Sequence, residues 1–546
     1  MTTPGNELLF LALGGSDEIG MNLNLYGCEG KWVMVDLGVT FGNADYPGID
    51  VILPDIEFIE QNRDNLLGIV LTHAHEDHIG AVPYFANDLG VPLYANRFTA
   101  AMIKGKLAEE GLEDKVKINI IDMDGEFDLG PFHFRFVQLA HSIPDMSACV
   151  ITTPYGRVFH TGDWKLDDDM GIGQQASADT LKAIGDEGVL ALVCDSTNVF
   201  NANPAGSEGG VKAGLLDMVR KAPARVLVTT FASNAARLQT LADVARETGR
   251  QLCVAGRSLD RIISVSQANG YLKNLPPIVD FETAMKLPRN KVLIISTGGQ
   301  GEPRAALARI AADVHQIKLD EGDWVLFSSR QIPGNEMAIG RIQNQLALKG
   351  VEMITERQAH IHVSGHPGRP ELAAMYDYIR PEIIVPVHGE VRHMMEQCRF
   401  ALAHGVPEAL FQRNGQIARL APGKPKIIDY VRSGRLVLDG DVILPADGET
   451  LNQRRKLSLN GHISVAIARD SEGYPRGSAQ VRYLGVPVEH ERDDFIRDMI
   501  DAADMAAGEP ARDIEKLREN IRLAVRRVAT EWTGKKPIVD VLILSV

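Results

Sequence analysis

The sequence predicts an α/β fold in three parts, and three patterns along the chain support this. Short apolar runs, several of which end in a polar residue, follow one another through the first 200 residues. Between residues 206 and 360, strand-like runs alternate with helical stretches, which is typical of a parallel sheet with helices between its strands. Residues 451–546 combine strand-like runs with one amphipathic helix, which predicts a small α+β domain.

Length and composition exclude several classes of protein. The chain has 546 residues, of which 45% are hydrophobic and 24% charged, so it is neither disordered, collagen-like nor coiled-coil. This length suggests about three domains. No run of 18 apolar residues occurs, and the N-terminus lacks the basic start of a secretory signal. The five cysteines stand far apart, as expected in a reducing cytoplasm, where we expect the protein to reside.

The net charge of −15 argues weakly against nucleic acid as a partner. A local positive cleft or bound metal ions can reverse the field at a site, so the charge does not exclude it. Residues 451–546 carry 16 Lys+Arg and 15 Asp+Glu, so the acidity lies in the first 450 residues.

The first 200 residues contain apolar runs that predict strands at 8–15, 21–28, 31–38, 67–73, 131–140, 149–163 and 189–196. Five polar residues follow directly on apolar runs: Asp36, His73, His141, Asp163 and Asp195. Polar residues at the same end of successive strands are how a sheet presents a site. The alternative is that each of them only begins a turn.

Strand-like runs followed by polar residues return at 360–366 and 382–390. We therefore expect residues 206–360 to be an α/β domain inserted into a first domain that comprises residues 1–205 and 361–450. The third domain comprises residues 451–546 and begins with an expected linker at 451–461. Its helix is predicted from apolar residues at spacings of three and four: Ile514, Leu517, Ile521, Val525, Val528 and Trp532.

The motif HAHEDH at residues 73–78 carries the clearest chemistry. His73, His75, Asp77 and His78 supply three imidazoles and a carboxylate, which are ligands of Zn²⁺ or Mn²⁺. His73 and His75 point the same way in an extended segment or turn, whereas Asp77 and His78 turn toward a neighbouring position. Two adjacent ions are therefore expected rather than one. A polar loop with histidines by chance is the alternative, but only 15 of the 546 residues are histidine.

Other strand ends supply the missing ligands. The expected first site consists of His73, His75, His141 and Asp163, and the second of Asp77, His78, Asp163 and His388. Asp163 can bridge two cations through its two oxygens. A water shared by both cations ionises near neutral pH and becomes a hydroxide nucleophile. Taken singly, His141, Asp163 and His388 are weak signals, because a lone histidine at a strand end is more often structural.

With HAHEDH in this context, the sequence resembles the metallo-β-lactamase superfamily. HIHVSGH at 360–366, PVHGE at 386–390 and CDSTN at 194–198 resemble motifs B, C and A of its β-CASP branch, which acts on nucleic acids. LGGSDEIGMN, FASNAARLQ, STGGQGEP and IPGNE are similar to the ribonuclease J family of bacterial RNA-processing nucleases. The third and fourth residues of GGSDEIG are more acidic than this family suggests. The resemblance implies an αββα sandwich with an inserted β-CASP domain and a small C-terminal α+β domain.

This resemblance also implies the reaction. It implies a two-metal ribonuclease that trims RNA from 5′-monophosphate ends in the 5′-to-3′ direction and also cuts internally, in rRNA processing and mRNA turnover. Zn²⁺ is the expected metal, with Mn²⁺ as the alternative. His366 and Asp195 match motifs B and A, so we expect them to transfer protons. Asp195 is otherwise explained as a cap in its turn, and Asp36 is expected to orient a ligand histidine.

A pocket for the terminal phosphate is the next implication of the resemblance. Hydroxyls, an amide and backbone N–H groups suit an anionic phosphate. The residues that match the family's pocket are Ser233, Asn234, Ala235, His362, Val363, Ser364, Gly365 and His366. Ser233 and Asn234 are equally well placed to cap the helix that follows them.

The resemblance further suggests a homodimer or homotetramer formed through the C-terminal domain, and membership of an RNA-degradation complex. No membrane partner is expected. Asp50 and Asp441 could bind Ca²⁺, but solvated turn aspartates are the competing interpretation.

Two other functions compete with the ribonuclease. A lactonase or thioesterase could use the same metal ligands, although a small substrate does not need a roughly 155-residue insertion. A non-catalytic RNA-binding subunit is the second alternative, although such proteins usually lose metal ligands and this chain keeps all seven.

Overall fold

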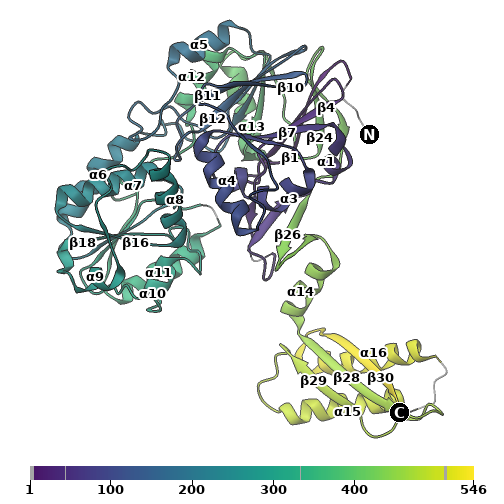
Figure 1. Cartoon of the computed structure of the whole chain (residues 1–546). Helices are drawn as coiled ribbons and strands as arrows, with labels where there is room; N and C mark the ends of the chain where they lie inside the picture. Colours follow the sequence, from purple (N-terminus) through teal and green to yellow (C-terminus); the bar gives the residue numbers. More distant parts are fainter. Residues whose placement is uncertain (1–4, 44, 333, 509–512) are drawn as a thin grey trace. The chain divides into compact units, whose positions relative to one another are not determined.

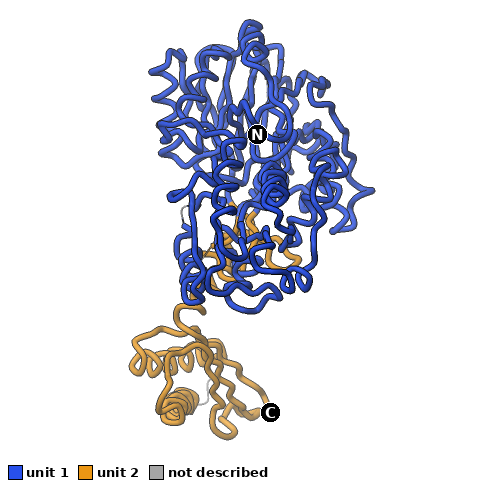
Figure 2. The backbone as a smooth tube through the Cα atoms, turned by 90° about the vertical axis from the view of Figure 1, so that its left-hand side faces the viewer, with its two compact units in different colours: residues 1–40, 53–434 blue, residues 41–52, 435–546 orange. Residues whose placement is uncertain are grey.

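The computed structural model describes residues 5–43, 45–332, 334–508 and 513–546. The first residues of the N-terminus and Pro333 of the IPGNE motif lie outside this part of the chain. The described chain forms a larger unit, residues 1–40 and 53–434, and a smaller unit, residues 41–52 and 435–546 (Figure 2). None of the described helices is both long and apolar enough to cross a membrane.

Two sheets face each other in the larger unit (Figure 1). In spatial order the eight-stranded sheet consists of β25 (Lys426–Tyr430), β24 (Gln416–Ala421), β1 (Leu8–Gly14), β3 (Leu23–Cys28), β4 (Lys31–Val35), β7 (Leu66–Leu71), β8 (Leu93–Ala95) and β9 (Ile118–Ile120). The seven-stranded sheet consists of β10 (Glu126–Leu129), β11 (Phe132–Gln138), β12 (Ser147–Thr153), β13 (Gly156–His160), β14 (Ala191–Asp195), β21 (Ile383–Val387) and β23 (Glu408–Ala409). Phe10 and Val70 of the first sheet share one buried core with Phe134 and Val193 of the second. Burial of this shared apolar surface holds the sheets together.

Helices cover the outer faces of both sheets. Those in the segments of the first sheet are α1 (Glu57–Gln61), α2 (Glu76–Ile79), α3 (Val82–Leu89) and α4 (Arg97–Glu109). Those beside the second sheet are α5 (Ala178–Asp186), α12 (Arg369–Ile379) and α13 (Val391–Ala403). Trp32 of β4 packs on Phe58 of α1, and Leu181 of α5 and Leu372 of α12 share a core with Leu192 of β14. The predicted αββα sandwich is thus confirmed.

An inserted domain interrupts the second sheet. β14 and β21 are parallel neighbours, and Asp195 of β14 pairs with Val387 of β21. The residues between these two strands include a separate six-stranded sheet, in the order β17 (Ile278–Val279), β16 (Gln251–Ala255), β18 (Val292–Ser296), β15 (Val226–Thr229), β19 (Trp324–Phe327) and β20 (Glu352–Ile354). Its strand pairs are all parallel, as the alternating pattern predicts.

Six helices of the described chain belong to the insert, of which the first precedes its strands and the other five lie between them. They are α6 (Glu208–Lys221), α7 (Ala235–Thr248), α8 (Arg257–Ala268), α9 (Phe281–Lys286), α10 (Ala306–Ala311) and α11 (Glu336–Leu348). Leu307 and Ile339 of α10 and α11 pack against the central strands through Leu227 and Ile294. The insert therefore has its own core, as an independent domain requires.

The smaller unit contains the C-terminal α+β domain. Strands β29 (Gln480–Leu484), β28 (His462–Arg469) and β30 (Ile538–Ser545) form its sheet, with helices α15 (Arg492–Ala507) and α16 (Ile514–Thr533). Leu517, Ile521 and Val525 of α16 are buried, as the spacing predicts. The segment expected as a linker at 451–461 is instead almost entirely helical, in α14 (Glu449–Asn460). Only Leu451 of α14 is buried, so the sequence of this helix shows no apolar periodicity.

Short strands complete the described fold. β2 (Ser16–Asp17) pairs with β22 (Gly389–Glu390). A four-stranded sheet has the order β27 (Val442–Pro445), β26 (Arg435–Asp439), β6 (Val51–Pro54) and β5 (Thr40–Phe41). The division of the chain at residues 205, 360 and 450 stays a prediction.

Candidate metal centre and active site

The carboxyl ends of parallel strands bring the site together. Asp195 is the last residue of β14, and His388 follows β21, the parallel neighbour of β14. Asp163 follows β13, which lies on the other side of β14. Polar residues that follow neighbouring parallel strands meet at one edge of a sheet. Residues 225 positions apart in the sequence thereby come within reach, and the His388 Nδ1 to Asp163 Oδ1 distance is 3.7 Å.

The HAHEDH motif begins in the loop before α2 and continues into that helix. His75 is the N-cap residue of α2, so Asp77 and His78 lie in the first turn of that helix. The backbone of Asp77 passes so close to Gly38 that a Cβ at Gly38 would lie 1.7 Å from the Asp77 carbonyl oxygen. A residue without a side chain is required at that close approach.

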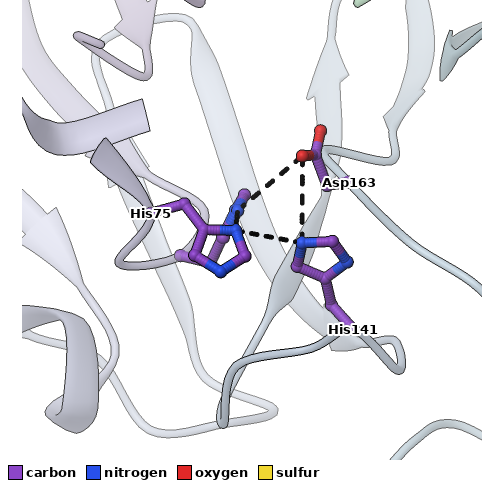
Figure 3. A group of neighbouring side chains, drawn as sticks. His75, His141 and Asp163 are labelled. Atoms are coloured by element: carbon purple, nitrogen blue, oxygen red, sulfur yellow. Dashed lines mark hydrogen bonds and ion pairs between the residues drawn. The ribbon is translucent and has the colours of Figure 1, made fainter. Parts of the chain in front are cut away.

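The first cluster contains His73, His75, His141 and Asp163. Figure 3 shows His75, His141 and Asp163 pointing toward one another. His75 Nδ1 lies 3.1 Å from both His73 Nε2 and His141 Nε2, and Asp163 Oδ2 lies 3.9 Å from each of these Nε2 atoms. Ligand distances of about 2.0–2.1 Å around a tetrahedral ion place the ligand atoms roughly 3.3 Å apart. The spacing in this cluster is close to that value.

The second cluster contains Asp77, His78, Asp163 and His388. Asp163 Oδ2 lies 3.2 Å from His78 Nε2, and Asp77 Oδ2 lies 3.1 Å from His388 Nε2. The ring centroids of His78 and His388 are 5.7 Å apart. All seven side chains singled out in the sequence are thus neighbours, and Asp163 belongs to both clusters.

The donor set fits divalent cations. Asp163 Oδ1 is buried and has no hydrogen-bond partner among the described residues. A buried oxygen without a hydrogen-bond partner destabilises the fold unless another group or an ion binds it. Burial lowers the pKa of His73 and His141 well below the usual value and that of His75 to about 4, so these imidazoles are neutral ligands. Burial alone would raise the pKa of Asp163, but His388 and His78 outweigh it and keep the carboxylate ionised.

A surrounding layer of hydrogen bonds orients these histidines. The Asp36 carboxylate accepts from His78 Nδ1 at 2.7 Å, which confirms the expected role of Asp36. Asp36 also accepts from the Thr72 backbone N–H and hydroxyl. His141 Nδ1 donates to the Gly365 carbonyl at 2.7 Å. Such contacts fix which ring nitrogen faces a metal.

A carboxylate–imidazole pair lies beside the two clusters. Asp195 Oδ2 accepts from His366 Nδ1 at 2.7 Å. Burial alone would lower the pKa of His366, but the Asp195 carboxylate outweighs it and raises the pKa above its usual value. The His366 ring is partly exposed, whereas Asp195 is fully buried. The pair therefore presents an imidazole held by a carboxylate, which is suited to proton transfer near neutral pH.

The predicted phosphate-pocket residues occupy two neighbouring segments. Asn234 is the N-cap residue of α7, and its side chain accepts from the Arg237 N–H. The alternative interpretation as a helix cap is therefore correct for Asn234, while Ser233 beside it is half-exposed. The Arg237 guanidinium donates to the Ile361 carbonyl, next to His362. Burial, followed by Arg237 and Arg330, lowers the pKa of His362 to about 3.

Sequence reasoning did not identify three residues that shape this site. The Thr197 hydroxyl donates to the His388 carbonyl at 2.9 Å, and Asn198 Nδ2 donates to Ser364 Oγ at 2.7 Å and to the His366 carbonyl at 3.1 Å. Arg237 is fully buried and paired with Glu208. Thr197 and Asn198 are the last two residues of CDSTN, so the motif itself contains the signal for two of them.

The proposed calcium ligands lie apart from these clusters. Asp50 and Asp441 are exposed, and neither belongs to a metal-ligand cluster among the described residues. Binding of Ca²⁺ there stays a prediction.

The sandwich and its two clusters define a hydrolase of the metallo-β-lactamase class, and residues 24–175 match that superfamily. Residues 223–346 match the ribonuclease J β-CASP domain, residues 350–409 a Zn-dependent metallo-hydrolase RNA specificity domain, and residues 449–546 the ribonuclease J C-terminal domain. The chain belongs to the ribonuclease J family of metal-dependent ribonucleases.

Relatives of similar length support this assignment. The chain is 42% identical to ribonuclease J of Sinorhizobium meliloti, over 99% of this chain and 98% of the relative. It is 35% identical to ribonuclease J of Mycolicibacterium smegmatis (97% and 95%) and 34% identical to ribonuclease J 1 of Streptococcus pyogenes (99% and 98%). A crystal structure of an Enterococcus faecalis protein of unknown function shares the fold, with a TM-score of 0.53, 17% identity and coverage of 76% of this chain and all of that one.

Proposed function

We propose that this ribonuclease degrades single-stranded RNA from 5′-monophosphate ends in the 5′-to-3′ direction and also cuts internally. The observation that carries the proposal is the position of the Asp195–His366 pair beside two ligand clusters that share Asp163. The pair and the clusters lie where the insert joins the sandwich, since β14 and β21 flank the insert. Roles in rRNA processing and mRNA turnover follow from the family resemblance.

The seven clustered side chains are the proposed metal ligands: His73, His75, Asp77, His78, His141, Asp163 and His388. Divalent ions held there would polarise the scissile phosphate and increase the acidity of water. The all-nitrogen-and-oxygen donor set with three histidines supports Zn²⁺ in the first cluster and also suits Mn²⁺.

Residues of the protein protonate the 3′ oxygen that leaves in the reaction. His366 in its protonated form donates a proton to the 3′ oxygen as the phosphodiester bond breaks. Asp195 accepts from Nδ1 of the ring, so Nε2 is the atom left to face the substrate. Asn198 donates to the His366 carbonyl and therefore holds the backbone of the acid in place.

The 5′ phosphate is proposed to bind between Ser233 and the loop of residues 362–366. Ser233 offers a hydroxyl, and Ser364 offers a second one that already accepts from Asn198. Arg237 is paired with Glu208, but the exposed Arg330 also contributes to the lowered pKa of His362, so Arg330 supplies positive charge at this position despite the acidic net charge. Local positive charge of this kind supports binding of a terminal phosphate.

Assembly and location are also proposals. The family resemblance supports a homodimer or homotetramer formed through the C-terminal domain, association with an RNA-degradation complex, and a cytoplasmic location. Five unpaired cysteines, of which four are buried, are consistent with a reducing compartment.

Digestion of end-labelled RNA with defined 5′ chemistry tests the proposed function. With Zn²⁺ or Mn²⁺, a 5′-monophosphorylated strand is expected to release mononucleotides from its labelled 5′ end. A 5′-triphosphorylated strand is expected to give internal fragments. Metal binding without cleavage of either strand would exclude the proposal and favour a small-molecule hydrolase or a non-catalytic RNA-binding subunit.

A further inference from the structure

A small recess lies at the carboxyl end of the parallel sheet of the insert. Its walls come from the segments that follow β15, β18 and β19, and include Thr230, Gly299 and Ser329. None of its lining residues belongs to the metal-ligand clusters. Carboxyl ends of parallel strands are where open α/β sheets bind their ligands. The recess has a volume of about 100 Å³, enough for roughly three waters or the edge of a sugar.

Thr230 and Ser329 are two hydroxyl-bearing residues that line the recess. Thr230 is only 2% exposed, and its Oγ1 has no hydrogen-bond partner among the described residues. Ser329 is 7% exposed, and its Oγ has only a weak contact of 3.5 Å with Gln300 Nε2. The Thr230 oxygen is itself inaccessible, so the Ser329 hydroxyl is the one that a ligand can reach. Buried hydroxyls normally have partners, so a ligand group that bonds Ser329 Oγ would satisfy an unmet requirement.

Glycine keeps the Ser329 hydroxyl accessible. A Cβ at Gly299 would lie 2.6 Å from Ser329 Oγ and would fill the space in front of that hydroxyl. Gly298 has a φ of +111°, which side-chain-bearing residues rarely adopt. The two glycines of the STGGQGEP motif therefore allow a ligand to approach this hydroxyl.

The chemistry at the mouth favours a sugar over a phosphate. Glu302 is exposed there and adds a carboxylate, while no Lys, Arg or His is among the described lining residues. An anion would be repelled, whereas hydroxyls of a ribose can donate to a carboxylate, as they do in dinucleotide-binding folds. Phe231 lies at the same mouth, 37% exposed, and an exposed aromatic ring can stack on a base of single-stranded RNA.

Hydrogen bonds connect this recess to the catalytic loop. Arg330, next to Ser329, donates to Asn198 Oδ1 at 3.3 Å, and Asn198 donates to Ser364. On the other side, Thr230, Phe231 and Ala232 line the recess, and Ser233 follows Ala232 directly in the chain. A strand of RNA bound at the 5′-phosphate pocket would therefore have a nucleotide within reach of the recess.

We propose that the recess binds the ribose of one RNA nucleotide. The hydroxyl of Ser329 bonds the 2′-hydroxyl, and Phe231 stacks on the attached base. The inference rests on the proposed function and adds a specificity element, because a 2′-hydroxyl is what distinguishes RNA from DNA.

A position-by-position 2′-deoxy scan tests this proposal with the metal-loaded, full-length protein. The substrates are 5′-monophosphorylated RNA strands that each contain one 2′-deoxynucleotide. Rapid-mixing fluorescence gives Kd before cleavage, and product analysis gives the cleavage rate. For the wild type, one position is expected to raise Kd about five-fold on loss of its 2′-hydroxyl, as for one hydrogen bond. Ser329→Ala should largely remove that difference.

Ser266→Ala is the matched control, because Ser266 is a buried, unpartnered hydroxyl of the insert but does not line the recess. It should keep the five-fold difference. The proposal is overturned if no position of the wild-type scan is sensitive, or if the difference persists in Ser329→Ala. Cleavage of the all-ribose strand tests the proposed ribonuclease function separately. The proposed function and the proposed ribose site can therefore fail independently.

Discussion

The Asp195 carboxylate accepts a hydrogen bond from His366 Nδ1 at 2.7 Å, although 171 residues separate them in the sequence. Asp195 ends the strand that precedes the insert, and His366 lies on the segment that follows the insert's last strand. The pair therefore joins the segment that leads into the insert to the segment that leads out of it, at the edge of the sandwich.

Replacing the carboxylate tests the role of this pair. Asp195→Asn should lower kcat about 100-fold or more with little change in KM, because an amide no longer holds a protonated His366. Metal content should stay at the wild-type level. Asp168→Asn, which removes an exposed carboxylate, is the control. Loss of metal from Asp195→Asn would contradict the assignment and make Asp195 a ligand, since its Oδ1 is 3.6 Å from His388 Nδ1.

Removing a ligand of the first cluster should abolish cleavage while leaving the fold intact. His75→Ala deletes the Nδ1 atom that lies 3.1 Å from both His73 and His141. The expected result is loss of bound metal by elemental analysis and no detectable cleavage, with an unchanged circular dichroism spectrum. His133→Ala removes a partly exposed histidine of β11 and should retain full activity. Wild-type turnover by His75→Ala would refute the metal assignment.

The sequence predicts those parts of the site that follow apolar strands. His73, Asp163, Asp195 and His388 could each be found because an apolar run ends at or just before them, and the structure places strands β7, β13, β14 and β21 there. Parallel neighbours then bring the ends together. Local pattern was sufficient for the parallel sheet of the insert, whereas the αββα sandwich was expected from the resemblance to the metallo-β-lactamase superfamily.

Contacts between distant residues without a local pattern could not be predicted. Arg237 bonds Glu208 and Ile361, and no spacing in the sequence indicates these partners. Helix α15 was missed because alanines, including Ala502 and Ala503, form part of its buried face, so its apolar periodicity is weak. Helix α14 was expected as a linker for the related reason that only one of its residues is buried.

A variant of the proposed 5′-phosphate pocket should show a weaker preference for 5′-monophosphate over 5′-triphosphate RNA. Ser233→Ala removes a half-exposed hydroxyl that is not needed for the α7 cap, since Asn234 supplies the cap. We expect the ratio of kcat/KM for 5′-monophosphate over 5′-triphosphate RNA to fall about five-fold. Ser464→Ala, on an exposed position of β28, is the control. An unchanged ratio in Ser233→Ala would remove Ser233 from the pocket.

The Lys165–Asp167 pair predicts a pH-dependent contribution to stability. Lys165 Nζ lies 2.6 Å from Asp167, and both side chains are buried. Burial alone would raise the pKa of Asp167, but Lys165 outweighs it and lowers the pKa below 3.8. A lowered folded-state pKa stabilises the fold above pH 3.8, and this contribution is lost as the pH falls through the folded-state value.

Asp167→Asn should therefore reduce the free energy of unfolding at pH 7 by about 3 kcal/mol, because it leaves a buried lysine unpaired. Urea denaturation at a series of pH values measures this difference, which should shrink as the pH falls below about 3.8. Asp168→Asn again serves as the control. A difference that stays constant down to acid pH would show that Asp167 acts through packing and not through its charge.

The buried Arg237–Glu208 ion pair is expected to stabilise the protein and to hold the segment before His366 in place. The Arg237 guanidinium bonds Glu208 through two nitrogens, at 2.6 and 3.0 Å, and also donates to the Ile361 carbonyl at 3.1 Å. Removing one member of a buried ion pair leaves the other charge without compensation, at a cost of about 3–5 kcal/mol. Arg237→Met should therefore strongly destabilise the protein, and Glu208→Gln added to it should recover part of the loss.

The double variant separates the effect of Arg237 on the stability of the protein from its effect on the position of the loop that ends in His366. It removes the uncompensated charge but still lacks the bond to Ile361, which precedes the loop that ends in His366. If Arg237 positions that loop, the double variant should fold and bind metal yet keep a raised KM for RNA. Chemical denaturation, metal analysis and steady-state kinetics measure the three quantities on one preparation. A double variant with wild-type KM would show that the pair serves only the stability of the insert.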